Sequence, residues 1–192
     1  YILVLGTLGA WLTTVDVNPT AIGLLSWAIL AYSFKFLWSA ALQRRTTPFG
    51  FKTGPRRFFM FVFLALVVAG MFFLSFSEPP NNLGRIGLIC VLIAAFSASF
   101  DIVLAAWRIE VAKNDMHLDI LSTVEQFGYR SAIFLGGFGA LIIADQVGWK
   151  LTFLGATCLI ALSGVGILIA KPSPLAETRI NSAERDESEQ LI

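Results

Sequence analysis

The sequence contains a series of apolar stretches, each about as long as a bilayer's hydrocarbon core is thick. A transmembrane helix needs about 20 largely apolar residues. Five stretches meet this requirement, at residues 20–42, 58–76, 86–107, 127–147 and 151–170. The opening residues 1–13 are apolar but too short to cross a bilayer, so we expect them to be the end of a helix whose beginning is missing. We therefore predict an all-α, polytopic membrane helix bundle with five whole spans and part of a sixth.

The amino-acid composition excludes several classes of protein. Hydrophobic residues make up 56% of the 192 residues and charged residues only 14%, whereas a soluble domain has about 25% charged residues. A soluble protein of this length has too much surface to cover with so few polar side chains. The sequence therefore excludes a soluble enzyme, a nucleic-acid-binding protein and a disordered chain. One histidine, His117, and two cysteines inside apolar stretches predict no metal site, cofactor or disulfide.

The basic residues are distributed unequally between the two sides of the predicted bundle. An excess of Lys and Arg in loops marks the cytoplasmic side. One side carries only Arg85 and Lys150, and the other carries ten basic residues: Arg44, Arg45, Lys52, Arg56, Arg57, Arg108, Lys113, Lys171, Arg179 and Arg185. We therefore expect the N-terminus and the C-terminal tail to be cytoplasmic. Residues 1–171 form the predicted membrane domain, and residues 172–192, rich in acidic residues, form a linker or tail.

Ionisable residues inside a predicted span are costly and usually face a polar interior. Asp101 lies deepest and shares one small, polar helix face with Ser97 and Arg108. A carboxylate in such a place can take up and release protons, so one hypothesis assigns it proton coupling or solute contact. The alternative hypothesis is a structural ion pair with Lys35 or Arg130.

Lys35 and Arg130 each allow two interpretations. Lys35 could extend its ammonium toward the headgroups, or it could be a cavity cation that pairs with Asp101 or binds an anionic solute. Arg130 could anchor its span at the cytoplasmic interface, or its guanidinium could hold a carboxylate by two hydrogen bonds. After Arg130, a small residue recurs every four positions, which predicts close packing against another helix; these residues are Ala132, Gly136, Ala140 and Ala144.

Four short motifs carry a family resemblance. Residues 32–38 read YSFKFLW, residues 100–110 read FDIVLAAWRIE, residues 128–130 read GYR, and residues 145–150 read DQVGWK. In that order they resemble the motifs Y-T-x-K-F-L-W, Q-D-I-V-x-D-A-Y-R-x-E, G-Y-R and D-x-x-G-W-R of the AmpG-type muropeptide permeases, a branch of the major facilitator superfamily. The motifs follow the family's order and spacing and span nearly the whole chain, so together they are specific.

The resemblance implies twelve helices in two halves with a solute cavity between them. This chain would be the N-terminal six-helix half, with its first helix truncated. The implied activity is that of a proton-coupled secondary transporter in a bacterial inner membrane, which imports anhydromuropeptides from periplasm to cytoplasm for cell-wall recycling. The implied partners are the bilayer, a small glycopeptide solute, a proton and the missing C-terminal half. No nucleic acid and no cofactor are implied.

The matching motifs also suggest roles for individual residues. Asp101 would couple protons, and solute binding would fall to Lys35, Tyr129 and Arg130, because the implied solute bears carboxylates. Structural or gating roles are expected near the cytoplasmic side for Arg44, Arg45, Arg56, Arg57, Arg108 and Glu110.

The chain departs from the family at two positions. The family's second aspartate of the fourth helix is Ala105 here, and an aspartate at the start of the loop after the second helix is replaced by Gln43. Proton coupling would then depend on Asp101 alone, and a charge that steadies the cytoplasmic gate would be absent. Alternatives are a related transporter for a siderophore or acetyl-CoA, and an inactive or self-assembling six-helix protein. A membrane-embedded enzyme is disfavoured, because no nucleophile–base pair or ligand cluster is visible.

Overall fold

The structure is a computed structural model, and it describes residues 2–20, 23, 32–39, 55–77, 79, 82–112 and 114–169. In this part of the chain the regular elements are helical, and no strand occurs. The main elements are α1 (Ile2–Thr14), α5 (Pro55–Ser75), α6 (Leu83–Val111), α7 (Asp115–Phe134), the π-helical turn η1 (Leu135–Gly139), α8 (Ala140–Val147) and α9 (Trp149–Ile169). The predicted all-α membrane bundle is confirmed, because the helices Arg56–Ser75, Leu83–Val111, Asp115–Val147 and Trp149–Ile169 are long and apolar enough to cross a membrane.

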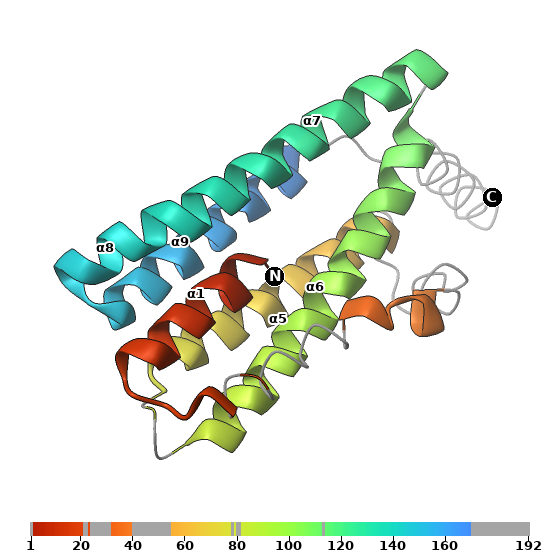
Figure 1. Cartoon of the computed structure of the whole chain (residues 1–192). Helices are drawn as coiled ribbons and strands as arrows, with labels where there is room; N and C mark the ends of the chain where they lie inside the picture. Colours follow the sequence, from red (N-terminus) through yellow and green to blue (C-terminus); the bar gives the residue numbers. More distant parts are fainter. Residues whose placement is uncertain are drawn as a thin grey trace, which may run out of the picture.

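Helix α5 packs against both α6 and α9, and α1 packs against η1 and α8. Figure 1 shows this arrangement, with α7, η1 and α8 continuing as one long helix beside α9. Local chemistry explains several helix ends. Pro55 occupies the first position of α5, where its missing N–H is not needed. Gly148 separates α8 from α9 with a φ of 84°, a conformation that glycine adopts without a steric penalty.

The connection between α6 and α7 is shorter than the sequence suggests. The polar residues 109–126, which we predict to form a helical connector, are indeed mostly helical, but they belong to α6, which extends to Val111, and to α7, which begins at Asp115. Asn114 caps α7, because its side chain accepts a hydrogen bond from the backbone N–H of His117 at 2.8 Å. The polar residues of the expected connector therefore form the first half of a membrane-length helix.

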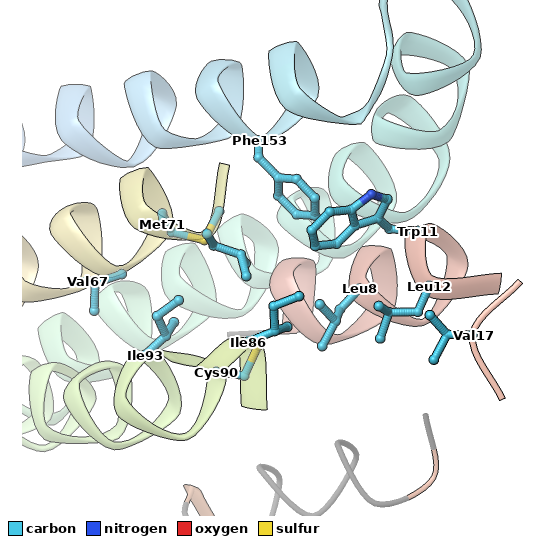
Figure 2. Packing of buried hydrophobic residues seen from close by; sticks show 11 residues of the cluster. Leu8, Trp11, Leu12, Val17, Val67, Met71, Ile86, Cys90, Ile93 and Phe153 are labelled. Carbon is cyan, nitrogen blue, oxygen red and sulfur yellow. The ribbon is translucent and has the colours of Figure 1, made fainter. Parts of the chain in front are cut away.

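The main apolar core lies where α1, α5, α6 and α9 meet (Figure 2). Trp11 of α1 and Phe153 of α9 contact each other edge to face, with ring centroids 5.1 Å apart. Around them lie the other buried members of this cluster, which we call the apolar core: Leu8, Leu12, Val17, Val67, Met71, Leu74, Ile86, Cys90 and Ile93. A smaller cluster of Met60, Leu64, Val103 and Ile167 joins α5, α6 and α9 farther along the bundle. Side-chain packing is the main force between membrane helices, so these clusters set how the helices lie.

Small residues allow close helix contacts at several points. A Cβ added to Gly70 of α5 would lie 2.7 Å from Cγ1 of Ile93, so this glycine lets α5 and α6 approach. Three members of the predicted small-residue stripe, Gly136, Ala140 and Ala144, are buried. The elements that carry them contact α1. The packing role predicted for the stripe is therefore confirmed at these three residues, while Ala132 is exposed.

Several predictions fall outside the described residues. Most of the predicted span 20–42 and the whole of residues 172–192 belong there, as do Gln43, Arg44 and Arg45. Residues 32–39 are described and supply part of the site considered next.

Candidate functional site

A cavity of about 540 Å³ opens along the second half of α6. Polar and charged side chains from three segments line it, together with small and apolar residues of α6. The lining residues are Lys35, Ser39, Arg56, Asp101, Ile102, Ala105, Ala106, Ile109 and Glu110. Two residues to which the sequence suggests functional roles, Lys35 and Asp101, are thus brought together in one cavity.

Asp101 is held by a tyrosine. The Tyr32 hydroxyl donates a short hydrogen bond to Oδ2 of Asp101, and both side chains are partly buried. Among the described residues, neither Lys35 nor Arg130 forms an ion pair with this carboxylate. The alternative of a structural ion pair with Lys35 or Arg130 is therefore not observed among the described residues, where Asp101 accepts a hydrogen bond from a phenol instead.

Lys35 lies over the ring of the same tyrosine. Its Nζ is 4.7 Å from the centre of the Tyr32 ring, within the range of a cation–π interaction. No carboxylate within the described part of the chain lies within ion-pair distance of this ammonium. Lys35 is half-buried and lines the cavity, so its positive charge is available to an anionic group that enters there.

A second hydrogen bond fastens the same segment to α6. The indole Nε1 of Trp38 donates to Oγ of Ser99 at 3.1 Å, and the Ser99 hydroxyl donates in turn to the Ala95 carbonyl at 2.8 Å. Ser99 is buried and neither residue lines the cavity. Two independent hydrogen bonds therefore attach segment 32–39 to α6. One is accepted by the Asp101 carboxylate, and the other joins two neutral side chains, Trp38 and Ser99.

An ion pair lies among the residues that line the cavity. Arg56 of α5 donates two hydrogen bonds to one carboxylate oxygen of Glu110 on α6, from Nε at 2.8 Å and from Nη2 at 2.5 Å. The two side chains are 24% and 15% exposed. Because each charge compensates the other, this pair adds little net charge to the cavity.

Further contacts connect four helices at this end of the bundle. Arg108 of α6 forms an ion pair with Glu125 of α7. Arg57 of α5 donates through Nη2 to the backbone carbonyl of Leu168, near the end of α9, at 3.4 Å. Carbonyls at a helix C-terminus lack partners within the helix, so a guanidinium there is favourable. The predicted structural or gating residues Arg56, Arg57, Arg108 and Glu110 thus take part in three separate polar contacts between helices, and their roles stay predictions.

Tyr129 and Arg130 lie apart from the cavity. Both are exposed on α7, and neither lines the space beside α6. Their assignment to solute binding therefore has no support from this geometry and stays a prediction. Sequence reasoning also missed the role of Tyr32, although this residue opens the YSFKFLW motif, because a neutral tyrosine in an apolar stretch does not stand out among ionisable residues.

The other end of the bundle differs in character. A cavity of about 370 Å³ lies there between the ends of α1 and α5 and the start of α9, and it is mostly apolar. Its rim carries Lys150, whose Nζ lies 4.8 Å from the centre of the Phe76 ring. In the described residues, no group of three His, Cys, Asp or Glu side chains is placed to hold a metal ion.

Comparison with known proteins gives a consistent set of relatives. The chain is 34% identical to an anhydromuropeptide permease of Escherichia coli K12, over 88% of this chain and 34% of the relative. It is 35% identical to a protein named as an AmpG 3 transporter in Rickettsia prowazekii, over 82% of this chain and 38% of the relative. A Rickettsia felis protein named as an AmpG 4 transporter is 26% identical, over 94% of this chain and 44% of the relative.

These relatives are longer than the chain. The chain spans between 34% and 44% of their lengths. No family model matches the sequence. The relatives' names are those of permeases and transporters and not of enzymes, in agreement with the prediction of a non-enzymatic, multi-pass membrane protein.

Proposed function

We propose, from its similarity to AmpG-type permeases, that this chain forms part of a proton-coupled carrier that imports anhydromuropeptides from the periplasm to the cytoplasm. The observation that carries the proposal is the shared cavity of Lys35 and Asp101. An ammonium and a carboxylate at bilayer depth are costly unless they face a wet pathway. A polar solute and a proton need such a pathway.

The proposal assigns a separate task to each of the two charges. Lys35 attracts a carboxylate of the solute, because no carboxylate of the described residues neutralises it. Asp101 carries the proton, because among the described residues no guanidinium or ammonium forms an ion pair with it, whereas Glu110 is paired with Arg56. Ala105 also lines the cavity and cannot titrate, so proton coupling rests on Asp101.

The proposal includes a second set of helices. The relatives are more than twice as long as this chain. We propose that further helices of a longer polypeptide complete the walls of the cavity beside α6, as alternating access requires two units that move about a central site. The same proposal puts the Arg56–Glu110 ion pair on the cytoplasmic side of a bacterial inner membrane.

The experiment measures uptake of radiolabelled anhydromuropeptide by the full-length protein in proteoliposomes under an inward proton gradient. Wild-type protein should accumulate the solute, and Asp101→Asn should abolish accumulation while retaining exchange of internal for external solute without a gradient. Lys35→Gln should weaken solute affinity about tenfold, as expected for the loss of one charge-assisted contact, and Lys35→Arg should restore most of it.

Two results would contradict this proposal. If the wild-type protein does not transport anhydromuropeptide, the solute is different, and siderophores and acetyl-CoA are the next solutes to test. If Asp101→Asn still accumulates solute under the gradient, proton coupling does not depend on this carboxylate.

A further inference from the structure

Tyr32 contacts both charges to which the proposed function assigns a task. Its hydroxyl donates a hydrogen bond to Oδ2 of Asp101. Its ring lies beneath the ammonium of Lys35, 4.7 Å from Nζ to the ring centre. One side chain therefore connects the proposed proton site to the proposed solute site.

The two contacts are linked through the backbone end of the side chain, because a swing of Tyr32 about its Cα–Cβ bond moves the hydroxyl and the ring together. A swing that lengthens the hydroxyl–carboxylate bond also moves the ring face beneath the ammonium. Among the described residues that line the cavity, the other charged groups are Arg56 and Glu110, and they compensate each other through two hydrogen bonds. In the described part of the chain, the group seen to act on both Asp101 and Lys35 is therefore Tyr32.

We propose that Tyr32 is a positioning residue that couples proton binding at Asp101 to solute binding at Lys35. This inference rests on the proposed function. While Asp101 is ionised, it accepts a hydrogen bond from the phenol hydroxyl, and this bond keeps the ring beneath the ammonium. A proton that binds the carboxylate neutralises the acceptor and weakens this charge-assisted bond. The side chain is then free to swing about its Cα–Cβ bond, and the Lys35 ammonium is released toward a carboxylate of the solute.

The coupling must also operate in the opposite direction. If a proton on Asp101 strengthens solute binding, the solute must strengthen proton binding by the same factor. Coupling between two sites typically amounts to a factor of about 5 to 150. Tyr32 keeps its own phenol proton in every state, so the proton transported is the one that binds and leaves Asp101.

The structure supplies a matched control for the test. Trp38 and Ser99 join the same segment to the same helix by a neutral hydrogen bond of 3.1 Å that involves neither charge. Trp38→Phe loosens the attachment of the segment without touching the coupling. Tyr32→Phe removes only the hydroxyl and keeps the aromatic face for Lys35.

The experiment measures the dissociation constant of radiolabelled anhydromuropeptide for the purified full-length protein at one acidic and one mildly alkaline pH. In the wild-type protein the affinity should be about tenfold higher at the acidic pH. In Tyr32→Phe the two affinities should agree within about twofold, as they should in Asp101→Asn, whereas Trp38→Phe should keep the wild-type ratio. Each variant is checked for monodisperse elution and for solute binding at one pH, which shows that it has folded.

Several outcomes would overturn the coupling role. The role is wrong if Tyr32→Phe binds solute and keeps the wild-type ratio, and it is also wrong if Trp38→Phe loses the ratio to the same extent. A wild-type protein that transports anhydromuropeptide under a proton gradient while Tyr32→Phe behaves normally refutes this inference and leaves the proposed function intact. A wild-type protein that neither binds nor transports the solute refutes both.

Discussion

The two halves of α6 contain similar apolar stretches but lie in different surroundings. The first half contributes Ile86, Cys90 and Ile93 to the apolar core, where these side chains are almost completely buried. The second half lines the cavity with Asp101 and Glu110. The first half meets α1 and α5 through apolar side chains, and the second half meets the Tyr32 segment and Arg56 through hydrogen bonds.

This contrast shows how one helix can serve two purposes. Packing holds the first half of α6 in a fixed position, because buried side chains with many contacts resist displacement. Hydrogen bonds at the other end can be exchanged for bonds to a solute or to water at little net cost. We therefore expect substitutions in the apolar core to change stability, and substitutions of Tyr32, Lys35 and Asp101 to change transport.

The largest effect on stability is expected at Phe153. Phe153→Ala would leave a void against Trp11 in the apolar core, and such a truncation costs about 3–5 kcal/mol of unfolding free energy. Denaturation in mixed detergent micelles would measure the loss. Leu162→Ala, at a residue 64% exposed on the same helix, is the control and should change little. Equal losses at both residues would contradict the division between a packed core and an exposed surface.

A smaller effect is expected at the ion pair between α5 and α6. Arg56→Gln leaves the Glu110 carboxylate without its guanidinium and should cost about 1–3 kcal/mol. The double variant Arg56→Gln with Glu110→Gln should recover part of this loss, because no charge is then left uncompensated. A double-mutant cycle measured by denaturation would give the coupling energy. Strictly additive losses would show that the two residues do not act as a pair.

A still smaller effect is expected where α5 and α6 approach most closely. Gly70→Ala would place a methyl group 2.7 Å from Cγ1 of Ile93, and overpacking of this kind costs about 1–2 kcal/mol. Gly155→Ala is the matched control, because nothing lies within 4 Å of the added Cβ, and it should be neutral or slightly stabilising. The measurement is the midpoint of thermal unfolding in detergent. The penalty should shrink in an Ile93→Ala background, and a penalty that persists there would rule out the clash as its cause.

The membrane helices were largely predictable, whereas their ends and partners were not. The predicted spans 58–76, 86–107 and 151–170 correspond to α5, α6 and α9 within a few residues. The connector predicted over residues 109–126 is helical as expected, but it is not a separate segment, because Asn114 caps α7 and the polar residues after it are good enough helix formers to continue that helix. Composition alone could not reveal that a polar stretch continues a membrane helix.

The candidate site was predictable only in part. Asp101 and Lys35 stood out because each is a charge in an apolar stretch, and both line the cavity. Tyr32 did not stand out, since its importance lies in a bond to a residue 69 positions away. The pairing of Arg108 with Glu125 likewise depends on how α6 and α7 meet and not on either local pattern.

The sequence by itself determined that this chain forms membrane helices and which of them carry charge. A backbone in hydrocarbon must satisfy its hydrogen bonds internally, so each apolar stretch of this length is expected to form a helix. The tertiary structure alone decided that the carboxylate of α6 accepts a bond from a phenol and that a lysine rests on the same ring. Such contacts depend on distances of a few ångströms between helices, and those distances are set by packing between residues far apart in the chain.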